Sequence, residues 1–81
     1  MNPYIVVIDC TNHNSEQRAL EYLEQQVEHL VVKSKTVRKG SIELNTEIRL
    51  KDDNTDFINT LADMEGVNNA VLVSYNGDYM G

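Results

Sequence analysis

A strict alternation of apolar and polar residues over positions 42–50 is the feature that most constrains the fold of this chain. The apolar-side set is Ile42, Leu44, Thr46, Ile48 and Leu50, and the polar set is Glu43, Asn45, Glu47 and Arg49. Because successive side chains of a strand point to opposite faces, this pattern predicts a strand with one buried and one polar face. The chain must therefore form a sheet that is covered on one side.

The first half of the chain predicts a central strand, a helix and an edge strand. Residues 4–8, Tyr-Ile-Val-Val-Ile, are continuously apolar, which is typical of a strand buried on both faces. Residues 15–29 carry Leu20, Leu23 and Val27 at helical spacing, and we expect Asn14 to cap this helix with Gln17 returning the bond. Residues 31–39 are a weaker strand whose lysines indicate a sheet edge, where charge blocks unwanted pairing.

The second half of the chain predicts a strand, a second helix and a last strand. Gly40 and Ser41 form the turn into the strand at 42–50, and a second helix follows, capped by Asn54 or Thr55 and ended by Gly66. Residues 70–75 are the last strand, and Asn76-Gly77 should turn the chain off the sheet edge. The order strand, helix, strand, strand, helix, strand predicts an α+β, ferredoxin-like fold. Its antiparallel sheet has the order 4-1-3-2 with two helices on one face.

Length and charge narrow the function classes. Eighty-one residues form one domain, 1–81, which we expect to be excised from a larger protein. The net charge of -6 disfavours nucleic acid, and Tyr4 is the one aromatic side chain that the predicted central strands offer for stacking bases. Four of the seven basic residues lie on the edge strand, where they indicate either a soluble edge or contact with anionic lipid.

The first strand-to-helix loop has the richest cluster of polar groups. We expect any small-molecule ligand or ion to bind at its six residues: Asp9, Cys10, Thr11, Asn12, His13 and Asn14. One cysteine with a histidine three positions later is too small a set for a closed metal site, so no metal or cofactor is predicted. A cysteine nucleophile beside a helix start lacks a glycine-rich oxyanion element, so we expect no enzyme activity.

The sheet face away from the helices should carry an apolar patch. The predicted interface set is Tyr4, Val6, Ile8, Val71, Val73 and Tyr75, with Ile5 and Val7 as the alternative set from the first strand. Exposed patches of this kind mark interfaces, which predicts a homo-oligomer.

Several segments resemble the C-terminal cytoplasmic domain of a bacterial family of multi-pass membrane proteins with an MgtC-like arrangement. The segments are Val32-Lys-Ser-Lys-Thr-Val37, residues 42–51, Met64-Glu-Gly-Val67 and residues 71–79. More distantly, the chain is similar to ACT domains, which are regulatory units that pair and bind small ligands. The resemblance implies a non-enzymatic regulatory or oligomerisation domain on the cytoplasmic side of the bacterial inner membrane. Its partners would be the membrane helices of the parent protein and a second copy, while the chain alone is soluble.

Overall fold

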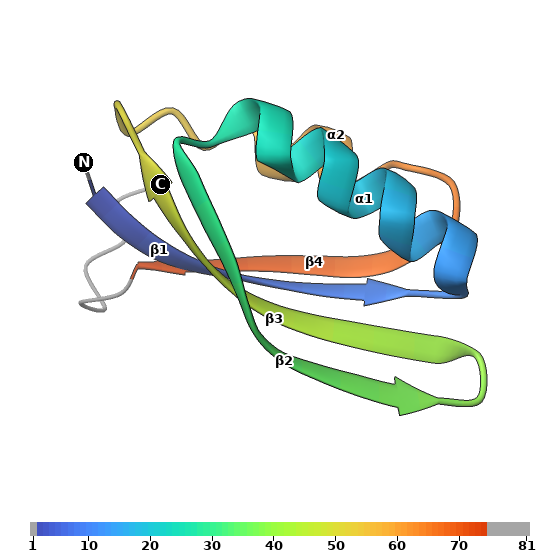
Figure 1. Cartoon of the computed structure of the whole chain (residues 1–81). Coiled ribbons are helices and arrows are strands. Elements are labelled where there is room, and N and C mark those ends of the chain that lie inside the picture. Colours follow the sequence, from blue (N-terminus) through green and yellow to red (C-terminus); the bar gives the residue numbers. More distant parts are fainter. Residues whose placement is uncertain (1, 75–81) are drawn as a thin grey trace.

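The computed structural model describes residues 2–74 and contains six elements in the predicted order. Figure 1 shows their arrangement along the chain. The elements are β1 (Asn2–Cys10), α1 (His13–Gln26), β2 (His29–Arg38), β3 (Ser41–Leu50), α2 (Phe57–Ala62) and β4 (Val67–Ser74). The predicted interface residue Tyr75 and the Asn76-Gly77 turn lie outside the described residues.

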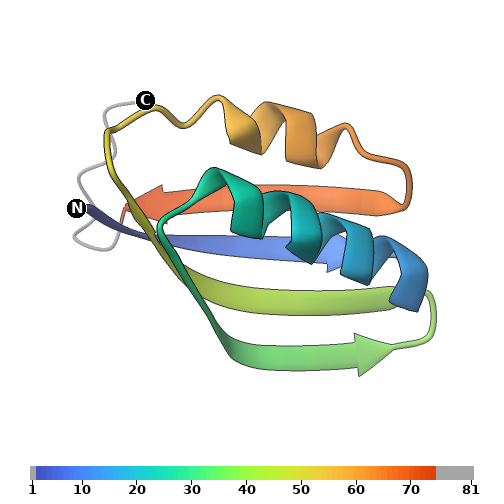
Figure 2. The same cartoon turned by 45° about the horizontal axis from the view of Figure 1, so that its top comes forward.

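The four strands form one antiparallel sheet in the order β2-β3-β1-β4. Both helices lie on the same face of this sheet, as Figures 1 and 2 show. The order equals the predicted 4-1-3-2 order counted from the other edge, and the ferredoxin-like fold is confirmed. Strands β1 and β3 occupy the centre, while β2 and β4 are the two edges.

The hydrophobic core lies between the helices and alternate residues of the central strands. Tyr4, Val6 and Ile8 are at most 8% exposed, because they pair with Ile48, Thr46 and Leu44, which face the helices. The prediction that these three residues lie on the uncovered face is therefore wrong. A strand that is apolar at every position carries no alternation of its own, and its pairing with β3 decides which set is buried.

The uncovered face carries the alternative set from β1, Ile5 and Val7, together with Val71 and Val73 of β4. Ile5 pairs with Val73 and Val7 pairs with Val71, so the four side chains are neighbours on that face. Val71 and Val73 are 41% and 42% exposed, whereas Ile5 and Val7 are half-buried by their neighbours in the sheet. We call Ile5, Val7, Val71 and Val73 the open-face patch.

The two helices differ in length and in how they begin. Helix α1 has fourteen residues and starts two positions earlier than predicted, because Asn12 rather than Asn14 is its N-cap. Helix α2 has six residues, and the side chain of its N-cap residue, Asp56, makes no hydrogen bond to the helix. Phe57 and Leu61 bury α2 against the core. Within residues 2–74, neither helix is long and apolar enough to span a membrane.

Candidate functional site

The first strand-to-helix loop is held to the neighbouring loops by its own polar side chains. The carboxylate of Asp9 accepts hydrogen bonds from Ser41 Oγ at 3.0 Å and from Asn68 Nδ2 at 3.0 Å. The hydroxyl of Thr11 donates to Asn68 Oδ1 at 3.0 Å, and the Thr11 amide donates to the carbonyl of Gly66 at 2.7 Å. Two of the predicted ligand-binding side chains are thus used to join β1, β3 and the start of β4.

Cys10 is fully buried at the end of β1 and is not disulfide-bonded. Burial raises the pKa of its thiol to about 11, and the nearby carboxylates of Glu16 and Asp9 add to the rise. A position close to a helix start lowers a thiol pKa only where the thiolate is accessible to solvent or to a positive charge. The Cys10 thiol is therefore protonated at neutral pH and cannot be reached by a substrate.

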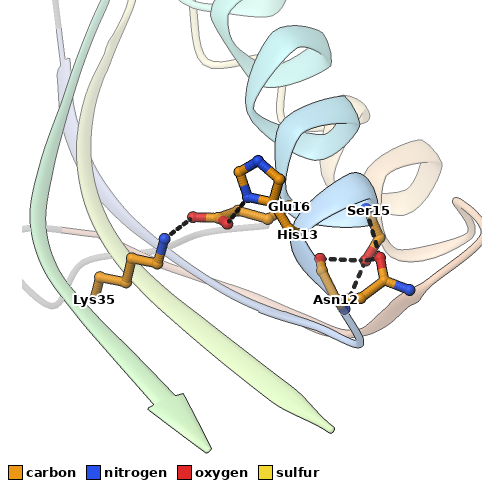
Figure 3. Close-up of polar contacts among 5 residues, drawn as sticks. All are labelled: Asn12, His13, Ser15, Glu16 and Lys35. Carbon is orange, nitrogen blue, oxygen red and sulfur yellow. Dashed lines mark hydrogen bonds and ion pairs between the residues drawn. The ribbon is translucent and has the colours of Figure 1, made fainter.

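Asn12 begins α1 through a capping box, which Figure 3 shows in detail. Its side-chain oxygen accepts from the Ser15 amide at 3.0 Å, and Ser15 Oγ accepts from the Asn12 amide at 3.1 Å. Two backbone donors of the first helical turn are satisfied in this way, and Ser15 is itself buried. Sequence inspection pointed to Asn14 because Gln17 follows it at the same spacing, but Asn14 lies exposed inside the helix.

An ionic cluster around a buried carboxylate lies beside this cap, between the first turn of α1 and β2. Glu16 is only 5% exposed, and its two carboxylate oxygens contact Lys35 Nζ at 2.8 Å and His13 Nδ1 at 3.3 Å. Figure 3 shows Lys35 extending from β2 toward the helix to make this contact. The hydrogen bond from Lys35 holds the pKa of Glu16 below its usual value, against the opposing effect of burial. The buried acid therefore stays ionised and ties the edge strand to α1.

A β-bulge places Lys35 on the helix side of the sheet. Val32 pairs with Thr46 and Ser34 pairs with Asn45, so Lys33 is an extra residue in β2. The extra residue reverses the alternation, and Lys35 pairs with Leu44 on the covered face instead of pointing to the open face. Sequence reasoning missed the Glu16–Lys35 pair because a bulge has no reliable signal in a polar edge strand.

The six predicted ligand residues thus have separate environments. Asp9, Thr11 and Asn12 hold loops and a cap, Cys10 is buried, His13 pairs with Glu16, and Asn14 is exposed. No three His, Cys, Asp or Glu side chains within residues 2–74 are arranged to hold a metal ion. A ligand-binding role for this loop stays a prediction, and any ligand would have to compete with these internal hydrogen bonds.

A cavity of about 310 Å³ lies between the second half of α1 and the loop before α2. It is open to solvent, and its lining residues are Tyr22, Gln26, Asp52, Asn54, Asp56, Phe57 and Thr60. Two of the lining side chains already bond to backbone, since Asp52 accepts from the Asn54 amide and Asn54 accepts from the Asp56 amide. The sequence predicts only a helix cap in this loop, at Asn54 or Thr55, and the one signal for the cavity is the cluster of polar residues at 52–56.

The open-face patch is a group of four apolar side chains that neither helix of residues 2–74 covers. Polar residues of β3, among them Glu43, Asn45 and Glu47, border the patch on one side. Asp9 and Asn69 close it at one end of the strands. An apolar group with a polar rim is typical of a protein–protein interface.

Comparisons with known proteins support the fold. No protein-family model and no curated protein matches the chain. A solved structure, the solution structure of the C-terminal domain of the MgtC protein from Mycobacterium tuberculosis, matches with a TM-score of 0.69 and 12% sequence identity. The match covers 100% of this chain and 95% of that domain. The sequence-based resemblance is thereby confirmed at the level of fold, and this chain folds like the C-terminal domain of MgtC.

Proposed function

We propose that this chain is a non-enzymatic regulatory or oligomerisation module that acts by pairing with a second copy of itself. The open-face patch is the observation that carries the proposal. Four aliphatic side chains lie together on the sheet face opposite α1 and α2, and two of them are more than 40% exposed. Burying such a surface against a copy would remove apolar area from water, at roughly 25 cal/mol per Å² before the costs of association.

The absence of enzyme activity is part of the same proposal. Its support is the state of the best nucleophile in the first loop, since Cys10 is buried and the pKa of its thiol is raised to about 11. His13, the histidine of the same loop, contacts the Glu16 carboxylate at 3.3 Å. An activated nucleophile needs an accessible group with a base directed at it, and these two residues do not supply that arrangement.

The likeness to the C-terminal domain of MgtC supports a proposal about where the module lies in the cell. We propose that it lies in the cytoplasm, C-terminal to the membrane helices of a parent protein. Fractionation of the source cells, with an antibody against residues 2–74, tests this location. The expected result is signal in the inner-membrane fraction that detergent releases and salt does not, whereas signal only in the soluble fraction would contradict it.

Sedimentation velocity over a concentration series from low to high micromolar tests self-pairing. The expected result for the unmodified chain is a mass that rises from monomer to dimer. Val7→Lys places a charge in the middle of the open-face patch and should shift the transition to at least tenfold higher concentration. Val37→Lys is the matched control, because Val37 is an exposed valine on β2, away from the patch. A monomer at every concentration would exclude self-pairing.

A further inference from the structure

Edge strand β2 and the turn after it concentrate the positive charge of the chain. Residues 29–40 contain four cations and no acidic residue, although the net charge of the whole chain is -6. The other residues therefore carry -10, the difference between -6 and +4. The four exposed cations are Lys33, Lys35, Arg38 and Lys39. Strand β2 borders the sheet on the side opposite β4, as Figure 2 shows, so an acidic domain has one positively charged edge.

Exposed valines lie among these cations. Val31, Val32 and Val37 are 52%, 41% and 64% exposed. Val31 lies on the open face, since it pairs with Glu47, whereas Val37 lies on the covered face, opposite Ile42. Apolar side chains therefore protrude from both faces of the same edge. Protection of an edge from strand pairing requires charge but not exposed valines, so protection alone does not account for the composition of β2.

The bulge at Lys33 separates one cation from the other three. Lys35 lies on the covered face and contacts the buried Glu16 carboxylate at 2.8 Å, so its charge is already neutralised within the fold. Among residues 2–74, no ion pair is made by Lys33, Arg38 or Lys39. Three positive charges are therefore available to a partner outside the chain.

Acidic residues beside β2 decide how a negatively charged partner can approach. Glu43 and Glu47 of β3 pair with Thr36 and Val31, and they lie on the open face one strand inward from β2. An anionic surface laid flat against the open face would meet these carboxylates. An anionic surface that meets the sheet edge-on contacts β2 first and keeps the carboxylates about 5 Å further away, the spacing of neighbouring strands. Charge therefore favours the edge-on approach.

We propose that β2 docks edge-on against the surface of an anionic phospholipid bilayer. The three cations without an ion pair contact lipid phosphates, and the three exposed valines enter the boundary between the headgroups and the acyl chains. Nucleic acid also attracts cations, but it offers no apolar layer to the valines, so the combination favours lipid. This inference goes beyond the proposed function and does not depend on it, because the open-face patch lies on β1 and β4.

Flotation with lipid vesicles tests the docking. The probes are vesicles of phosphatidylcholine alone and vesicles of an equal mixture of phosphatidylcholine and phosphatidylglycerol. The chain should float with the anionic mixture at low salt and not with phosphatidylcholine alone. Binding to the mixture should fall as salt is added, because salt screens the contact between cations and phosphates. No flotation with the mixture at low salt, or equal binding to both kinds of vesicle, would overturn the proposal.

Charge variants locate the contact on the domain. Lys33→Gln and Lys39→Gln should each weaken binding about fivefold, the effect of one cation near an anionic membrane. Lys51→Gln is the matched control and should bind like the unmodified chain, because Lys51 is an exposed cation that follows β3 at the end away from the β2–β3 turn. Equal losses in all three variants would assign the binding to overall charge and overturn docking through β2.

Tryptophan substitution tests the apolar part of the contact. The chain contains no tryptophan, so Val37→Trp introduces a single fluorescent reporter. Its emission should move to shorter wavelength on the anionic vesicles and should be quenched by brominated lipid. Val71→Trp, in the open-face patch, is the control and should show neither change. The opposite pattern would show that the open-face patch meets the bilayer and would overturn docking through β2.

The outcomes separate the lipid contact from the proposed function, because self-pairing is measured in solution without lipid. A dimer that does not float with the anionic vesicles would overturn the lipid contact alone. A monomer that floats would support the lipid contact and overturn self-pairing. Binding to single-stranded RNA without binding to the anionic vesicles would overturn the lipid contact and assign the cations of β2 to nucleic acid.

Discussion

Neighbouring residues of β1 show how differently the two sheet faces are used. Val6 is completely buried beneath the helices, while Val7, the next residue, lies on the open face and pairs with the exposed Val71. The covered face joins every element of the fold, so a change there affects the whole domain. The open face packs against nothing within residues 2–74 except its own strand neighbours. One side of β1 therefore stabilises the fold, and the opposite side is available for contact with another molecule.

The sharpest test of this difference replaces isoleucine on each face. Ile8→Ala removes a fully buried side chain and should lower the free energy of unfolding by about 4 kcal/mol, through lost burial and the cavity left behind. Ile5→Ala on the open face should cost about 1 kcal/mol or less. Urea unfolding followed by circular dichroism measures both. If Ile8→Ala is too unstable to measure, Ile8→Val should still cost about 1 kcal/mol. Equal losses at positions 5 and 8 would contradict the assignment of faces.

The two glycines with positive φ provide a second matched pair. Gly66, at φ 84°, lies against the first turn of α1, where an added Cβ would clash with Ser15 Cβ and come within 2.9 Å of its Oγ. Gly40, at φ 75°, has nothing within 4 Å of the same position. Gly66→Ala should therefore cost about 3 kcal/mol, from backbone strain plus overpacking, and Gly40→Ala about 1 kcal/mol from strain alone. Equal midpoint shifts in thermal unfolding would show that the Ser15 contact is unimportant.

The sequence predicted most of the fold because its patterns are local. Alternation over 42–50 identifies the covered face of β3, and Ile42, Leu44, Ile48 and Leu50 are all buried as that pattern requires. The strand at 4–8 was recognised, but its apolar residues offer two equally good faces. Only the register of β1 against β3, a contact between distant parts of the chain, decides between Val6 and Val7.

The candidate site was harder to predict for the same physical reason. Whether Asn12 or Asn14 caps α1 depends on Ser15, whose side chain completes the box and is then buried beside Gly66. The Glu16–Lys35 pair depends on the bulge at Lys33, which sequence periodicity does not reveal. A lysine on an edge strand indicates that the edge is protected from pairing with another strand. Lys35 has a different role, because its charge neutralises the buried Glu16 carboxylate.

The buried acid makes the stability of the fold depend on pH, through a contact on the covered side of the sheet. Because the pKa of Glu16 is lowered in the folded state, its stabilising effect is complete above the usual carboxyl value of 4.5 and is lost as the pH falls through the folded-state pKa. Glu16→Gln should cost about 1.5 kcal/mol at neutral pH, the scale of one hydrogen bond to a charged group. The difference from the unmodified chain should shrink in acid. Urea unfolding at a series of pH values measures it, with Glu47→Gln on the open face as the control. A loss at Glu16 that is independent of pH would show that the carboxylate charge is not what stabilises the fold.

The smallest expected effect separates the residue that begins α1 from the one sequence inspection favours. Asn12→Ala removes the side chain that accepts from the Ser15 amide and should cost about 1 kcal/mol, the usual value of an N-cap. Asn14→Ala changes an exposed position inside the helix, where alanine has the higher helix propensity, and should be neutral or slightly stabilising. Thermal unfolding of the two variants in parallel makes the comparison, since both exchange asparagine for alanine two residues apart. A larger loss of stability in Asn14→Ala than in Asn12→Ala would indicate that Asn14, the residue predicted from sequence, is the N-cap. The expected order instead places the start of α1 at Asn12, where the same turn carries the Ser15 and Glu16 side chains that bind the helix to the covered face.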